Sequence, residues 1–456
     1  MRSCQTHAIA VVLRRLGIAL LVATTCLTAG GARAFATASS SAVTLRIWYG
    51  TDDPTEAPLA QSLVAQFQHS HPGVRVALSV FGLDDINTTL QLAMSAGTPP
   101  DLVYTTPRGP GLPAYVRAGK LLDLTAVAAR EHWAAQLPSG MLAAYNDALA
   151  PTGSAGGHVY AAPMIVAAVG VLYNEELFRQ LHLAVPYSIA EFEAICAKVK
   201  AAGLIPIGFG NADGWVGDDW YLTLVNARTG PGPLLPELHL DPRFSFSNPA
   251  FESAASTLLE WDDDGYFTPQ FGGLDAQDSV VTFFDGKTAM QLISSTEDGQ
   301  ITALAQQTGI PIGVFAFPNA NRQQAPVVPE SGYAGWAIPR DGRQPALAEA
   351  FIGDMLSDST AQALTAHGLL AAHALASRSS SGQSPLERGY IAALRDATPG
   401  VYLDGAPVPN LNATMEANIQ LLLQHFETPS FLTRALQLVY SSHGANASAT
   451  RTDGEF

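Results

Sequence analysis

Cysteine and positive charge are both scarce in this 456-residue chain. Of its three cysteines, Cys4 and Cys26 lie in the first 34 residues, so Cys196 stands alone in the remainder and can form no intramolecular disulfide. We expect Cys196 to be a buried core thiol, because it lies in a helical pattern that requires a small apolar residue. Lys and Arg number 24 against 40 Asp and Glu. Since nucleic acids bind clustered positive charge, we expect no nucleic-acid partner.

Motifs of several enzyme classes are also missing. The sequence contains no nucleophile elbow, zinc-binding motif, phosphate-binding loop or dinucleotide fingerprint. We therefore predict a protein that is not an enzyme and has no cofactor. Asp213, Asp218 and Asp219 lack the spacing of a calcium-binding loop, so we also predict no metal. A secreted carbohydrate-active enzyme stays an alternative, because its paired carboxylates leave no local signature.

Residues 1–34 are typical of a secretion signal. Arg14 and Arg15 precede an apolar run over residues 16–29 that is too short to span a bilayer comfortably. Ala32-Arg33-Ala34 then offers a small-x-small cleavage site. We predict export to the periplasm or extracytoplasmic face by a signal peptide. Two alternatives stay open: a retained membrane anchor, and lipid attachment at Cys26, although the residues before Cys26 match the usual pattern poorly.

Strand and helix patterns alternate from Val43 onward. The helical spacing of apolar residues over Glu56–His69 separates two apolar strands, Val43–Trp48 and Val74–Val80. Such alternation predicts an α/β fold with a parallel sheet, and the length predicts two domains. Further strands are expected at Asp101–Tyr104, His158–Ala162, Val166–Tyr173, Ile205–Phe209, Ile312–Phe317 and Ala334–Ile338. Further helices are expected at Asp84–Ala96, Glu175–Leu181, Ser188–Ala202, Phe251–Asp262, Ala346–Leu356, Thr360–Leu364, Pro385–Arg395 and Asn412–Gln424.

The segment Phe283–Met290 predicts a helix that ends at a glycine and continues directly into a strand. The helix is expected to start near Asp275, and Gly286 can adopt the left-handed conformation that ends it. Thr288–Ile293 is short and apolar, as a buried strand should be.

Six segments, in order along the chain, carry a resemblance to a known family. They are Leu45–Gly50 with His71–Val74, Ala93–Val103, Gly157–Pro163, Tyr173–Phe178, Phe283–Met290 and Gly332–Pro339. In this order they resemble segments of the periplasmic solute-binding proteins of ABC importers, of the maltose/oligosaccharide type. The second is similar to A-x-G-x-x-P-D-V and the fifth to F-x-x-G-K-A-A-M. The chain departs from the pattern at His158, where lysine is common, and at Tyr333, where glycine is.

This resemblance implies two interleaved α/β lobes joined by hinge strands, with a ligand cleft between them that closes by a hinge motion. The implied N-terminal lobe comprises residues 35–165 plus 297–327, and the C-terminal lobe residues 166–296 plus 328–440. Residues 441–456 are polar and aperiodic, which predicts a disordered tail. The implied partners of this expected monomer are a small-molecule ligand and the membrane subunits of an ABC permease.

Candidate ligand-binding residues follow the strands, because open α/β sheets bind ligands at the carboxyl ends of their strands. Tyr49 and Asp53 follow the first strand, and a turn with capping acids is the alternative. Asp84 follows the second strand, and capping of the next helix is the alternative. Thr106 and Arg108 follow the third, where a plain surface loop is the alternative.

Aromatic residues predict the ligand class. Trp215 and Trp220 lie in a segment with three Asp and one Tyr, suited to stacking on sugar faces and binding sugar hydroxyls. For Trp220 the alternative is the start of a buried helix. Glu297 follows the strand after Phe283–Met290, and the resemblance places Tyr333 and Trp336 on a strand facing the cleft. We predict a neutral mono- or oligosaccharide as ligand. Glycerol phosphate, a polyamine, or a role as a signalling or adhesion ectodomain stay alternatives.

Overall fold

The computed structural model describes residues 43–51, 56–106, 112–138, 141–149, 157–234, 236, 241, 243–376, 383–395, 397–401, 403, 408 and 410–452. The strands are β1 (Val43–Gly50), β2 (Val74–Phe81), β3 (Leu102–Thr105), β4 (Ala161–Asn174), β5 (Ile205–Gly208), β6 (Thr288–Ser294), β7 (Ile312–Phe315), β8 (Val327–Ala337) and β9 (Thr398–Gly400). The helices up to the middle of the chain are α1 (Glu56–Ser70), α2 (Leu83–Ser95), α3 (Leu112–Arg117), α4 (Thr125–Arg130), α5 (Met141–Leu149), α6 (Glu175–Gln180), α7 (Ile189–Ala201) and α8 (Trp215–Thr229). The later helices are α10 (Pro249–Asp263), α11 (Ala276–Phe284), α12 (Asp298–Thr308), α13 (Pro345–Met355), α14 (Asp358–Ala366), α15 (Ala372–Ala376), α16 (Pro385–Arg395), α17 (Leu411–Leu423) and α18 (Pro429–Thr452). Short 3-10 turns are η1 (Trp133–Ala135), η2 (Phe271–Gly273) and η3 (Ser295–Glu297).

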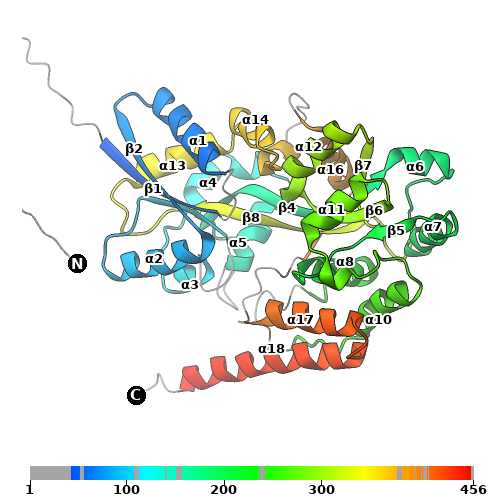
Figure 1. Ribbon diagram of the computed structural model, residues 1–456. Coiled ribbons are helices and arrows are strands. Elements are labelled where there is room, and N and C mark those ends of the chain that lie inside the picture. The colour runs from blue at the N-terminus through cyan, green and yellow to red at the C-terminus, as the bar shows by residue number, and fades with distance from the viewer. Residues whose placement is uncertain are drawn as a thin grey trace, which may run out of the picture. The chain divides into compact units, whose positions relative to one another are not determined.

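The described strands form one mixed sheet with helices on both faces (Figure 1). Its order is β2-β1-β3-β8-β4-β6-β5, with β7 paired to β4 and β9 to β8. The α/β class predicted from the sequence is confirmed, but the prediction of a parallel sheet is wrong. Strands β1, β2 and β3 are parallel, and so are β5 and β6, yet β4 and β8 run antiparallel to their neighbours β3 and β6 and to each other.

Strand β4 is continuous where the sequence predicted two separate strands, His158–Ala162 and Val166–Tyr173. Pro163 suggested a break, because proline cannot donate a ladder hydrogen bond. The pairing with β8 shifts register between Pro163 and Val166, and this irregularity accommodates the proline within one strand.

The described residues form two large hydrophobic cores. The first takes residues from β1, β3 and α13 to α16, and the second from β5, α7, α8, α10, α17 and α18. Strands β4 and β6 contribute to both, so the chain interleaves between the two cores. Cys196 lies buried in the second core, as expected from the sequence. The residue boundaries given above for the two lobes stay a prediction.

The helix stop at Gly286 is confirmed. The Asp275 side chain caps α11 by accepting a hydrogen bond from the Asp278 backbone N–H, and the helix ends before Gly286 at φ 74°. A Cβ on Gly286 would meet no atom within 4 Å, so glycine is required there only by the backbone conformation.

We expect Gly286→Ala to lower the free energy of unfolding by about 1 kcal/mol, because a Cβ disfavours the left-handed region. Chemical denaturation followed by circular dichroism measures it. The matched control is Gly353→Ala, in the interior of α13, where a Cβ also meets nothing within 4 Å. This control should stabilise the protein by up to about 1 kcal/mol, because alanine favours helix. Equal shifts in both variants would refute the conformational argument.

The N-terminal ends of α7 and α2 can also be compared with the sequence. A serine followed three residues later by a glutamate favours a capping box, and Ser188 does cap α7 by accepting from the Glu191 backbone N–H. The Glu191 carboxylate, however, accepts from the backbone N–H of Tyr187 rather than that of Ser188. Asp84 does not cap α2, because Gly82 occupies the N-cap position.

Helix α18 packs against α10 and α17 and continues through Thr452, where the sequence predicted a disordered tail from Ser441 (Figure 1). Leu432, Leu436 and Tyr440 recur at helical spacing and are buried in the second core, which anchors the helix. Residues 453–456 lie outside the described residues. None of the described helices is long and apolar enough to cross a membrane.

Candidate functional site

Two of the predicted ligand-binding aromatic residues, Tyr49 and Trp336, lie together inside the first core. Tyr49 ends β1, stacks on Tyr104 with ring centroids 4.5 Å apart, and donates its hydroxyl to Glu56 at 3.0 Å. Trp336 on β8 packs against both tyrosine rings, and its indole N–H points to the Met164 sulfur at 3.2 Å. Both side chains are buried, so their ring faces contact protein in this conformation. Their role as ligand contacts stays a prediction.

The carboxyl end of β3 gathers buried hydroxyl groups. Thr105 and the predicted site residue Thr106 follow one another there, and Tyr145 reaches the same place from α5. None of their three hydroxyl oxygens has a hydrogen-bond partner. Gly335 pairs with Thr105, and a Cβ at Gly335 would lie 2.8 Å from the Tyr145 hydroxyl, so glycine is needed for this close packing. We call Thr105, Thr106 and Tyr145 the β3 edge.

A second set of polar groups follows β5. Asn211, Asp218 and Tyr221 are buried, and the Asn211 Nδ2, Asp218 Oδ1 and Tyr221 hydroxyl atoms have no hydrogen-bond partner. We call these three residues the α8 edge. Buried polar atoms without partners are costly in a folded protein, so a set of them at a strand end marks a place for a ligand or water.

The loop that carries Asn211 is held firmly. Its Oδ1 atom accepts from the Gly217 backbone N–H at 2.8 Å, which fixes the amide against α8. The Gln420 side chain of α17 donates to the carbonyls of Asn211 and Ala212 at 2.9 and 3.0 Å. Because these bonds use the Asn211 oxygens, its Nδ2 atom is left as an available donor.

Asp218 is electrostatically unusual. Burial, followed by the nearby charges of Asp219 and Glu416, raises its pKa well above the ordinary value. Burial, followed by the charge of Asp218, raises the pKa of Tyr221 in turn. Since the Asp218 carboxyl tends to hold a proton, it can donate as well as accept hydrogen bonds, as suits a hydroxylated ligand.

The two tryptophans of the predicted stacking segment differ in environment. Trp215 begins α8 and is only partly buried, so its ring can meet a ligand. Trp220 is fully buried and packs edge-on against Trp261 and Phe317. The structure therefore favours for Trp220 the alternative weighed from the sequence, a buried helix. This geometry does not test whether Trp215 or Trp220 contacts a ligand.

The other five predicted site residues take different places. Asp53 and Arg108 lie outside the described residues. Asp84 lies in the first turn of α2 and Tyr333 on β8, but the structure does not describe their side chains. Glu297 lies in η3, where its carboxylate accepts from the Ser294 backbone N–H at 2.9 Å.

Sequence reasoning did not identify Tyr145 as a site residue. It lies in α5, a helix that the sequence patterns did not predict, and it reaches β3 only through tertiary packing. Asn211 and Asp218 belonged to the Trp-rich segment, where the aromatic residues drew the prediction instead.

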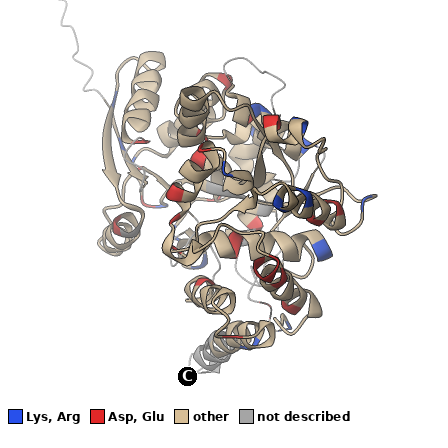
Figure 2. Cartoon of the chain, turned by 45° about the vertical axis from the view of Figure 1, so that its right-hand side comes forward, with Lys and Arg blue, Asp and Glu red and all other residues tan. Residues whose placement is uncertain are grey.

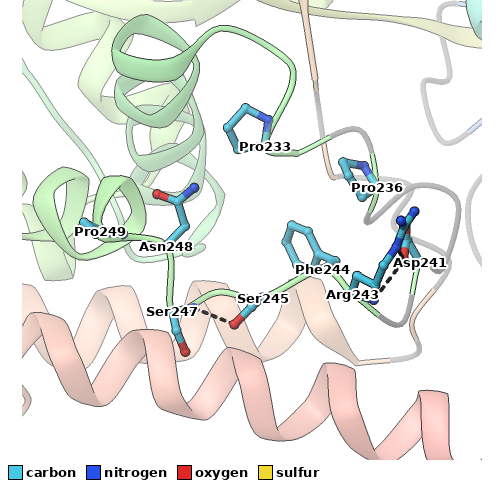
Figure 3. A pocket seen from close by; sticks show the side chains of 9 residues that line it. All are labelled: Pro233, Pro236, Asp241, Arg243, Phe244, Ser245, Ser247, Asn248 and Pro249. Atoms are coloured by element: carbon cyan, nitrogen blue, oxygen red, sulfur yellow. Dashed lines mark hydrogen bonds and ion pairs between the residues drawn. The ribbon is translucent and has the colours of Figure 1, made fainter.

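Figure 3 shows a hollow of about 670 Å³ at the N-terminal end of α10. It is lined by three prolines, Phe244 and a group of short polar side chains, and Arg243 pairs with Asp241 at 2.7 Å. None of the predicted site residues lines it. Figure 2 shows Lys and Arg interspersed with Asp and Glu on the helices of the face in view.

The chain belongs to the family of bacterial extracellular solute-binding proteins, whose family model matches residues 51–362. This confirms the family predicted from the sequence and indicates a location outside the cytoplasm. A curated relative, the multiple sugar-binding protein of Streptococcus mutans, is 23% identical over 269 residues. That match covers 57% of this chain and 58% of the relative, so the chain spans little more than half the length of that protein.

Solved structures give the same fold. A chitin oligosaccharide binding protein superposes with a TM-score of 0.71 at 21% identity, over 89% of this chain and all of that one. The solute-binding protein RafE in complex with raffinose superposes with a TM-score of 0.66 at 20% identity, over 87% of this chain and 99% of that one. The predicted two-lobed fold is confirmed, and these similar proteins are binding proteins.

Proposed function

We propose that this chain is the solute-binding component of an ABC importer that captures a neutral mono- or oligosaccharide. The observation that carries the proposal is the presence of two sets of buried polar groups without partners, the β3 edge and the α8 edge. In the sheet order, β3 and β5 stand on either side of the long strands β8 and β4. A ligand held between the two edges would therefore be held from both lobes.

The chemistry of the edges suits a polyol. Hydroxyl groups of Thr105, Thr106 and Tyr145 both donate and accept, the Asn211 amide donates, and the Asp218 carboxyl does either. A sugar presents hydroxyls that do the same, and the partly exposed ring of Trp215 can stack on its apolar face. The names of the similar proteins, which mention multiple sugars, chitin oligosaccharides and raffinose, agree with this ligand class.

The rest of the proposal concerns how the protein acts in the cell. Residues 1–34 direct export as a cleaved signal peptide, with lipid attachment at Cys26 as the alternative. The monomer delivers its ligand to membrane permease subunits by closing its lobes, without a catalytic step. The lobes comprise residues 35–165 plus 297–327 and residues 166–296 plus 328–440.

We expect a neutral oligosaccharide to raise the melting temperature, because a ligand that binds only the folded state stabilises it. Thermal-shift screening of neutral mono- and oligosaccharides, with glycerol 3-phosphate as the anionic comparison, identifies the ligand, and calorimetry measures its affinity. Thr106→Val should then weaken binding about tenfold by removing one hydrogen bond.

Thr106→Val should leave the melting temperature of the free protein unchanged, because the hydroxyl has no partner there. Thr282→Val, at a partly buried position of α11 where the hydroxyl donates to the Asp278 carbonyl, is the control and should bind like the wild type. The proposal fails if no sugar stabilises the protein, or if the protein hydrolyses an oligosaccharide instead of binding it one to one.

A further inference from the structure

A cavity of about 660 Å³ lies beside the turn that follows β6. Its walls come from η3, α12, the end of α14 and Ser384, which precedes α16. It shares no lining residue with the β3 edge or the α8 edge. The turn η3 is hydrogen-bonded to strand β4, because the Ser295 hydroxyl donates to the Val166 carbonyl at 2.9 Å and accepts from the Ala168 N–H at 3.0 Å.

Two carboxylates line this cavity, and no described Lys or Arg lines it with them. Glu297 accepts from the Ser294 backbone N–H, and the described partners of Asp298 are the hydroxyls of Thr302 and Ser384. The remaining wall consists mainly of threonine hydroxyls and glutamine amides. A buried carboxylate without a cation is costly, so the empty cavity is electrostatically incomplete.

A third carboxylate stands directly behind the wall. Glu387 of α16 is 1% exposed, and its Oε1 atom accepts from the hydroxyl of Thr365, which lines the cavity. Its other oxygen, Oε2, is buried and has no hydrogen-bond partner. The backbone N–H of Glu387 donates to Ser384, the same residue that donates to Asp298. Glu387 thus does not line the cavity itself but is hydrogen-bonded to two residues that do, Thr365 and Ser384.

We propose that this cavity binds a small organic cation that carries primary ammonium groups, at a site separate from the sugar site. An ammonium group donates three hydrogen bonds and carries the positive charge that would neutralise the two lining carboxylates, Glu297 and Asp298. The hydroxyl and amide groups of the wall hydrogen-bond its further polar atoms. The cavity is large enough for a diamine such as putrescine.

Protonation of the acids supports this assignment. Burial raises the pKa of Glu297 to about 7, and burial also raises the pKa values of Asp298 and Glu387. Among the described residues, the other titratable or charged groups beside these acids are His367 on the cavity wall and Tyr390 and Arg388 on α16. Because an ammonium group requires the ionised carboxylate, the cation should bind more tightly at pH 8 than at pH 6.

Calorimetry of the full mature chain with putrescine tests the proposal, with 1,4-butanediol as the neutral analogue of the same length. We expect one putrescine site, at least tenfold weaker at pH 6 than at pH 8, and no heat from the diol. Saturating the protein with its sugar should leave putrescine bound. Competition between the two would place putrescine in the sugar site and overturn the proposal, and equal binding of Ca²⁺ would overturn it in favour of a metal site.

Two variants locate the site. Glu297→Gln should weaken putrescine binding at least tenfold at pH 8 while leaving sugar affinity unchanged. Gln306→Lys places a tethered ammonium on the cavity wall and should also abolish binding, whereas Gln307→Lys, one residue further along α12 and off the wall, should not. Unchanged putrescine affinity in both Glu297→Gln and Gln306→Lys would refute this site. It would leave the sugar-binding function standing, because that function is measured separately.

Discussion

Replacing Trp220 by alanine is expected to lower the free energy of unfolding by about 3 to 5 kcal/mol, the usual cost of deleting a large core aromatic ring. The ring is fully buried in the second core, with its centroid 5.4 Å from that of Trp261 and 5.6 Å from that of Phe317, both nearly perpendicular to it. Deleting it leaves a cavity and removes two edge-to-face contacts. Urea denaturation followed by circular dichroism measures the change.

The comparison with Trp215 separates packing from ligand binding. Trp215→Ala should cost much less stability, because this ring is only partly buried, yet it should weaken sugar binding if the ring stacks on the ligand. Trp220→Phe should recover most of the stability that Trp220→Ala loses, since the indole N–H of Trp220 has no partner. If the Trp220→Ala protein has normal stability and reduced sugar affinity, the packing role is wrong and Trp220 contacts the ligand.

Sequence patterns predicted most of the fold because periodicity and helix ends are local. The helix–glycine–strand segment around Gly286 and the cap at Ser188 both followed from neighbouring residues. Strand β4 was harder, because Pro163 breaks the local pattern, and only pairing with β8 makes the strand continuous. The direction of β4 and β8 is likewise a tertiary property, which explains why the sheet is mixed rather than parallel.

The candidate site was less predictable, because an aromatic residue after a strand can face a ligand or the core with the same sequence pattern. Tyr49 and Trp336 are buried against each other and Tyr104, an arrangement that depends on β1, β3 and β8 lying side by side. The rule that ligands bind at strand ends still selected Thr106, and it selected the segment that contains Asn211 and Asp218. The rule could not select Tyr145, because this residue lies in the interior of helix α5 and does not follow a strand.

Glu297 should make the stability of the protein fall as the pH rises. Burial, only partly opposed by the hydrogen bond from Ser294, raises its pKa from the ordinary value of 4.5 to about 7. Below pH 4.5 the carboxyl is protonated in both the folded and the unfolded chain, and no penalty applies. Between pH 4.5 and about 7 the unfolded chain has released a proton that the partly buried folded carboxyl still holds, so stability falls over this range and levels off above it.

Glu297→Gln removes this titration and keeps an oxygen that can accept the Ser294 N–H. Near pH 4 the variant should match the wild type, and at pH 8.5 it should be more stable by about 1 to 3 kcal/mol, the upper value corresponding to the full pKa difference. Urea denaturation at a series of pH values, without any diamine present, measures both curves. Asp298 and Glu387 titrate in both proteins, so the difference between the curves isolates Glu297. Glu252→Gln, at an exposed position of α10, is the control and should run parallel to the wild type throughout. If the Glu297→Gln curve also runs parallel, the carboxyl ionises without cost in the fold, and the electrostatic argument for a cation beside it loses its basis.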